Sequence, residues 1–147
     1  MNIKRLYKLE LGDAVTIFNE PFTYVGHAAI ELDSGHKLRW LYDDEGRMFS
    51  VSVQDEEMIL FSEVEDELEP DEEIVLFRGK EYEFEYEDAG VVVESKGEAL
   101  AEGDDRFLFS DYQTQGGDIV RLVENESTGE STVYVGVYVS DEDVSEM

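Results

Sequence analysis

The sequence predicts an all-β protein with an internal duplication, in which two small antiparallel lobes, barrel-like or sandwich-like, pack together. Val, Ile, Phe, Tyr and Thr alternate with polar residues in short runs, and turns rich in Gly, Asp and Asn separate these runs. One motif also occurs twice, since the segment RWLY at 39–42 returns as RFLF at 106–109. The order of strands before each copy is the same, which indicates a repeated β unit.

Each half is predicted to contain its own set of hairpins. The strands of the first half are expected at 14–18, 22–26, 28–32, 37–42, 48–53 and 58–61. Those of the second half are expected at 74–77, 82–84, 90–94, 106–109, 118–124 and 131–139. Between the halves, residues 63–73 combine a dense acidic run with Pro70, which marks a junction. The predicted lobes are therefore residues 1–69, with a basic lead-in, and residues 70–147.

The repeated aromatic residues are predicted to build the cores of the two lobes. The repeat relates Trp40 to Phe107 and Phe18 to Phe77. All four side chains are expected to be buried, because large aromatic residues contribute most to the burial that stabilises a core.

Residues 81–87 alternate strictly between glutamate and aromatic residues. Successive side chains of a strand point to opposite faces, so this pattern predicts three aromatics on one face and four carboxylates on the other. The ordinary interpretation is a half-buried strand whose charged face resists pairing with other strand edges. The functional alternative is a row of carboxylates that binds a basic partner.

Arg39 and Arg106 hold equivalent places at the start of the repeated motif, in a chain that has few basic residues. Their ordinary role would be to neutralise carboxylates such as Asp44 and Asp111. Together with the glutamates they define the candidate partner surface, which comprises Glu81, Glu83, Glu85, Glu87, Arg39 and Arg106.

The formal net charge is −27, from 38 acidic and 11 basic residues. Such a field repels nucleic acid and anionic membranes and attracts basic proteins and cations. We therefore expect no direct binding to nucleic acid and a protein partner that is itself basic. Solubility in a salty cytoplasm is the ordinary explanation of the acidity, and the sequence leaves both explanations and the oligomeric state open.

No feature of the sequence directs the chain out of the cytoplasm. Cysteine is absent, so disulfides and thiolate metal sites are excluded. The basic N-terminus is not followed by the apolar region of a signal peptide, and no apolar run reaches the roughly 18 residues of a membrane helix. We expect a soluble, cytoplasmic protein that does not insert into membranes.

The sequence contains no recognisable catalytic, cofactor-binding or metal-binding motif. His27 and His36 are the only histidines, and neither has a second ligand at metal-binding spacing. No serine lies in a nucleophile elbow, and no glycine-rich phosphate loop follows a strand. We therefore assign no catalytic residue, cofactor or metal and expect a protein that is not an enzyme.

Structural glycines and aromatics give the chain a resemblance to a known family. The matching segments are 11–13 (LGD), 22–26 (FTYVG), 39–41 (RWL), 109–112 (FSDY) with 116–117 (GG), and 134–136 (YVG). This pattern resembles the bacterial domain-of-unknown-function family numbered 4178 over nearly the whole chain. The resemblance implies no established activity. It implies an accessory role in membrane-stress or polyamine-related systems.

Three functions are consistent with the sequence. The first is a non-enzymatic binding module that engages a protein partner through its acidic surface or the groove between the lobes, and an exposed apolar patch would mark it. The second is an acidic mimic of nucleic acid, which requires carboxylates arrayed along one elongated face. The third is an enzyme that uses a buried pair of carboxylates, which requires a deep pocket holding two acids with raised pKa.

Overall fold

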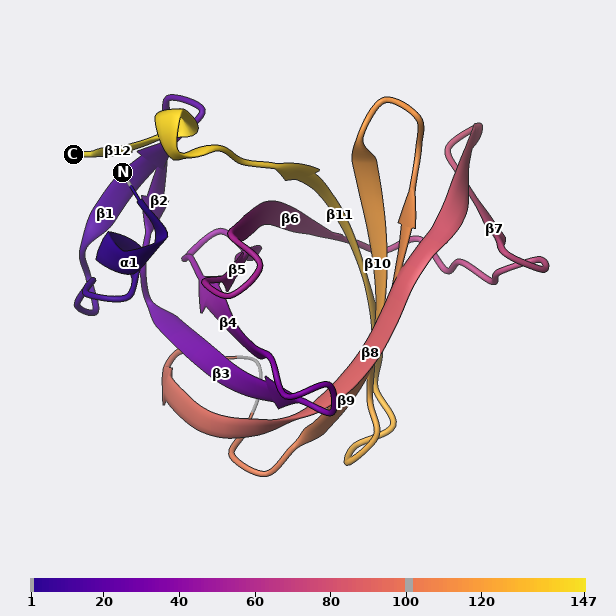
Figure 1. Ribbon diagram of the computed structural model, residues 1–147, viewed down its shortest axis with the longest axis horizontal. Helices are drawn as coiled ribbons and strands as arrows, with labels where there is room; N and C mark the ends of the chain where they lie inside the picture. Colours follow the sequence, from indigo (N-terminus) through magenta and orange to yellow (C-terminus); the bar gives the residue numbers. More distant parts are fainter. Residues whose placement is uncertain (1, 100–101) are drawn as a thin grey trace.

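Eight strands close into one antiparallel barrel, as the computed structural model shows for residues 2–99 and 102–147 (Figure 1). The barrel strands are β3 (Gly26–Leu32), β4 (Lys37–Tyr42), β5 (Arg47–Ser52), β6 (Glu57–Val64), β8 (Lys80–Gly97), β9 (Arg106–Gln113), β10 (Asp118–Asn125) and β11 (Ser131–Tyr138). Outside the barrel lie α1 (Ile3–Leu6), β1 (Ala14–Ile17), β2 (Glu20–Thr23), β7 (Ile74–Phe77), a 3-10 helix (Asp141–Asp143) and β12 (Val144–Glu146).

The two halves of the chain complete each other in this barrel. Each half contributes four consecutive strands, β3-β4-β5-β6 and β8-β9-β10-β11, and the halves pair at two seams. One seam joins β6 to β11 and the other joins β3 to β8, so strands that hold the same place in each half pair with each other. The expected duplication into two lobes is not confirmed, because neither half closes a barrel of its own.

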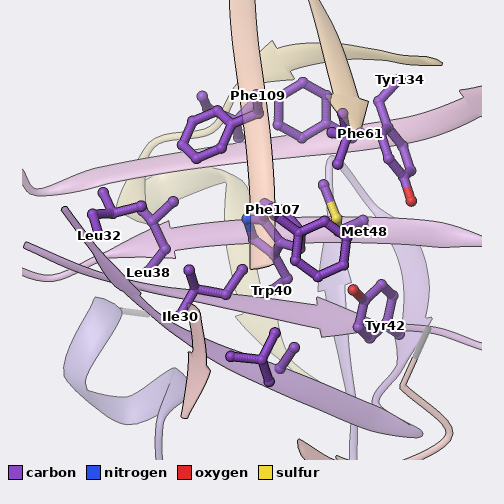
Figure 2. Close-up of a cluster of buried hydrophobic side chains, with 14 of the residues drawn as sticks. Ile30, Leu32, Leu38, Trp40, Tyr42, Met48, Phe61, Phe107, Phe109 and Tyr134 are labelled. Atoms are coloured by element: carbon purple, nitrogen blue, oxygen red, sulfur yellow. The ribbon is translucent and has the colours of Figure 1, made fainter. Parts of the chain in front are cut away.

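The two copies of the repeated motif lie on β4 and β9 and meet inside the barrel. Trp40 and Phe107 pack edge to face with ring centroids 5.3 Å apart, and Phe109 packs against Trp40 from the next inward position (Figure 2). Burial is confirmed for Trp40, Phe107 and Phe77. Trp40 and Phe107 therefore share one core inside the barrel, whereas Phe77 packs in a separate cluster on its outer face.

The predicted burial of Phe18 is wrong, since 42% of this residue is exposed. Phe18 and Asn19 both adopt positive φ, at 51° and 65°, and form the two-residue turn between β1 and β2. Tight turns of this kind match the twist of a hairpin and leave their central side chains outside the core. The turn therefore comes one residue earlier than the sequence pattern indicates.

Two hairpins cover opposite outer faces of the barrel, as Figure 1 shows. The β1–β2 hairpin pairs with β12 through β1, and with α1 it packs against the outward side chains Leu41, Phe49 and Val51. The hairpin of β7 and the start of β8 packs against Tyr112 on β9 and Val120 on β10, which belong to the same half of the chain. Each half therefore begins with a hairpin that covers the outer face of its own strands.

We predict that Gly136→Ala destabilises the fold by about 1 to 3 kcal/mol. Gly136 on β11 lies opposite Phe61 of β6, and a Cβ atom at Gly136 would come within 2.5 Å of the Phe61 ring. Urea unfolding followed by circular dichroism measures the change. The matched control is Gly103→Ala, where an added Cβ meets no atom within 4 Å and stability should not change. Equal stability of the two variants would contradict this packing.

Candidate functional site

The barrel interior is filled at its middle and hollow towards its ends. The larger cavity has a volume of about 500 Å³, within the usual range of small-molecule sites. It opens at the end of the barrel where β4 begins and β9 ends. It is lined by Leu32, Ser34, His36, Leu38, Asp55, Glu57, Glu85, Tyr86, Asp88, Phe109, Asp111, Gln113, Ile119, Arg121 and Tyr138. We call this cavity the acidic mouth, because five of its lining residues are Asp or Glu.

An ion pair lies at the floor of the acidic mouth. Arg121 on β10 donates from Nε to Asp111 Oδ1 at 2.7 Å and from Nη2 to Asp111 Oδ2 at 2.8 Å. Its Nη1 donates to Ser50 Oγ at 3.0 Å. Only 2% of the Arg121 side chain is exposed, so all these bonds form away from water. A bidentate pair of this geometry is the arrangement that compensates best for burying two charges.

Aromatic rings hold the guanidinium of Arg121 from two sides. Its central carbon lies 4.6 Å from the ring centroid of Phe61 and 4.8 Å from that of Phe109. Burial opposes the charge of Arg121, but Asp111, with smaller contributions from Glu57 and Tyr86, holds the pKa of Arg121 above its ordinary value. Arg121 is therefore a fixed cation whose charge is already neutralised by Asp111.

The carboxylates above this floor differ in how they are engaged. Asp88 accepts hydrogen bonds from the Tyr86 hydroxyl at 2.5 Å and the Ser34 hydroxyl at 3.1 Å. The side-chain carboxylates of Glu57 and Glu85, in contrast, have no hydrogen-bonded or ion-paired partner among the described residues. Burial raises the pKa of Glu57, and the neighbouring Asp111 and Asp55 raise it further against the opposing charge of Arg121. The mouth thus presents two unpaired carboxylates, one of them half-buried.

A β-bulge in β8 brings part of the mouth into place. The register of β8 against β9 shifts between Phe84 and Tyr86, so Phe84 lies opposite Tyr112 whereas Tyr86 lies opposite Asp111. The extra residue reverses the facing of the strand from that point. Tyr82 and Phe84 pack outside the barrel, while Tyr86 packs against Phe109 and lines the mouth. The predicted face of three aromatics therefore breaks at this bulge.

The six residues of the candidate partner surface do not lie together. The four glutamates are exposed, but Glu85 lines the acidic mouth whereas Glu81 and Glu83 line a shallow hollow next to the β9–β10 turn. Arg106 binds Asp33 through two bonds of 3.1 and 2.6 Å. Arg39 lies over the ring of Tyr7 at 4.2 Å. Neither arginine pairs with the carboxylates expected from the sequence, since Asp111 is bound by Arg121.

The sequence did not identify Arg121, Asp111 or Glu57 as functional residues. A signal for Arg121 was present, because it stands between Ile119 and Val123 at the inward positions of its strand. A charged residue on the apolar face of a strand is rarely buried unless it is paired. Its partner Asp111 comes from the adjacent strand and could not be read from local spacing.

His27 is buried in a separate polar chain on the outer side of β3. Its Nε2 donates to Glu94 at 2.7 Å, and the Tyr24 hydroxyl donates to its Nδ1. Burial lowers the pKa of His27, although the hydrogen bond to Glu94 acts in the opposite direction. These contacts satisfy both ring nitrogens, so His27 on β3 joins Tyr24, which follows β2, to Glu94 on β8.

Among residues 2–99 and 102–147, no three His, Asp or Glu side chains are arranged to hold a metal ion. That same part of the chain contains no helix with the length and apolar character needed to cross a membrane.

Comparison with known proteins gives one match. The model of a family described as a domain of unknown function, DUF4178, matches residues 10–141 of this 147-residue chain. No curated protein and no solved structure matches the chain. The family resemblance seen in the sequence is therefore confirmed.

We predict that Asp111→Asn destabilises the protein by roughly 3 to 5 kcal/mol, because it leaves the charge of Arg121 buried without a counterion. Thermal and urea unfolding measure the loss. The double variant Asp111→Leu with Arg121→Met removes both charges and should recover most of the stability. Asp33→Asn, which breaks the solvent-exposed pair with Arg106, serves as the control and should barely move the midpoint. A stable Asp111→Asn variant would contradict the buried pair.

Proposed function

The chain belongs to the DUF4178 family of unknown function, and on that premise we propose that it is a non-enzymatic binding protein whose acidic mouth takes a small organic cation. The observation that carries the proposal is the pair of unpaired carboxylates, Glu57 and Glu85, at a cavity of about 500 Å³. An unpaired carboxylate that is half-buried is costly, and a cationic ligand would offset that cost.

The charge around the mouth favours a cation over an anion or a neutral compound. Five carboxylates line the cavity, and its single guanidinium is already bound by Asp111. Low-dielectric walls focus such a field and raise the local concentration of ligands of opposite sign. Below the carboxylates, Leu38, Phe109 and Ile119 supply an apolar wall. A ligand that joins an ammonium group to an apolar body fits both parts.

The same geometry supports binding more than catalysis. A carboxylate pair that performs acid–base chemistry requires two acids with separated pKa values. In the acidic mouth the pKa of Glu57 is raised, whereas Asp111 is held by two hydrogen bonds from Arg121. Asp111 is therefore engaged as the counterion of Arg121.

A second candidate function is the engagement of a basic protein partner. Ile74 and Leu76 on β7 are 38% and 62% exposed, and they lie opposite Glu83 and Glu81 on β8. An exposed apolar pair beside carboxylates is the marker expected of an acidic binding surface. The mimicry of nucleic acid has less support, because the glutamates of 81–87 do not continue along one face. A cytoplasmic location and a role in membrane-stress or polyamine-related systems stay predictions.

Isothermal titration with three six-carbon probes tests the proposed cation site. We expect hexylammonium to bind, hexanol to bind at least tenfold more weakly, and hexanoate not to bind, because only the first pairs with the carboxylates. Glu57→Gln and Glu85→Gln should each weaken hexylammonium binding, by roughly tenfold for the half-buried Glu57. Raising the salt concentration should also weaken it.

Glu67→Gln is the matched control, because it makes the same change in net charge at an exposed position away from the mouth. It should leave the affinity for hexylammonium unchanged. The proposal fails if hexanoate binds as well as hexylammonium, or if Glu67→Gln weakens binding as much as Glu57→Gln does.

A further inference from the structure

A second cavity lies at the opposite end of the barrel, where the same strands present their other inward residues. Leu38 on β4 and Glu57 on β6 line the acidic mouth. Tyr42 and Glu63, further along the same two strands, line the second cavity. The volume of the second cavity is about 230 Å³. Its walls are the aromatic residues Trp40, Tyr42, Phe107 and Tyr134, and Glu63 and Glu130 lie at its rim. We call it the aromatic end.

Two tyrosine hydroxyls lie at the aromatic end. Tyr42 and Tyr134 are each only 5% exposed, and neither hydroxyl has a hydrogen-bond partner among the described residues. Both tyrosines line the cavity, and Figure 2 shows the hydroxyl end of Tyr134 directed toward Tyr42. Neither hydroxyl oxygen is fully enclosed, because among the described residues Trp40 Nε1 is the only fully buried polar side-chain atom without a hydrogen-bond partner. Both hydroxyls are therefore available to a bound molecule.

The charge at the aromatic end is negative and uncompensated within the cavity. Glu63 and Glu130 are exposed at the rim, and no Lys, Arg or His is among the residues that line it. The carboxylate of Glu63 lies close enough to Tyr134 to raise the pKa of that hydroxyl, after the larger effect of burial. Aromatic faces attract cations as well, most strongly when water is excluded.

We propose that the aromatic end is a second ligand site, which takes a small ammonium ion about the size of choline. The walls surround the cation, the tyrosine hydroxyls bind a polar group attached to it, and Glu63 and Glu130 favour its charge. The cavity is smaller than the roughly 300 Å³ at which drug-sized sites begin, which excludes larger ligands. This site does not depend on the acidic mouth, from which the layer of Trp40, Phe61 and Phe109 separates it.

Fluorescence of Trp40 reports directly on the aromatic end, because Trp40 is the only tryptophan of the chain and lines this cavity. Titration with choline should change the emission in a saturable way. The matched probe is 3,3-dimethyl-1-butanol, which has the shape of choline and no charge. We expect it to bind at least tenfold more weakly, because it lacks the attraction of the cation to the rings and carboxylates.

Two variants identify the groups responsible. Glu63→Gln should weaken choline binding severalfold through the loss of charge. Tyr42→Phe removes one hydroxyl and keeps the ring, so it should weaken choline binding severalfold while leaving the aromatic wall of the cavity in place. Glu67→Gln is the control for net charge and should not change the titration. The proposal is overturned if choline produces no saturable change, if the neutral probe binds equally well, or if both variants bind choline like the wild type.

Discussion

Closure of the barrel by pairing of β3 with β8 is the constraint on which the rest of the structure depends. This seam joins residues that lie far apart in the chain, from Gly26 opposite Gly97 to Leu32 opposite Gly90. Gly90 allows the approach, because a Cβ atom there would come within 2.6 Å of the Glu31 carbonyl oxygen. With the seam formed, the sheet has an inside, and only then can it hold a buried core with a cavity at each end.

The interior combines apolar packing with one buried ion pair, and this combination positions the acidic mouth. Arg121 and Asp111 occupy volume that aliphatic side chains would otherwise fill, between the rings of Phe61 and Phe109. A buried pair gives little net stability compared with an apolar replacement of similar volume. Its consequence here is geometric, because it provides a rigid polar floor above which Glu57 and Glu85 remain unpaired. Gly136 contributes to the same arrangement by leaving room for the ring of Phe61.

The alternation of apolar and polar residues predicts most of the strands, because a strand with one buried face leaves this pattern within its own short segment of sequence. The hairpins of β3 with β4 and β5 with β6 lie where the pattern placed them. Pairing between the halves was not predictable, since a repeat of strands is equally consistent with two lobes or one shared barrel. The bulge at Glu85 and the pairing of Arg121 with Asp111 could not be predicted from the sequence either. Both depend on the register between neighbouring strands, which the spacing of residues within one strand does not determine. Arg106 stands out in the sequence because it repeats Arg39, yet its partner Asp33 lies across the β3–β8 seam.

The most direct test of the single barrel is measurement of nuclear Overhauser contacts between backbone protons across its two seams. The structure places Ala29 opposite Glu94 at the β3–β8 seam and Phe61 opposite Gly136 at the β6–β11 seam. Close contacts between the members of both pairs in one protein, together with slow amide exchange at each seam, are the result that this account predicts. Contacts at the β6–β11 seam alone, with rapidly exchanging amides along β3, would show that the barrel is open and would contradict the account.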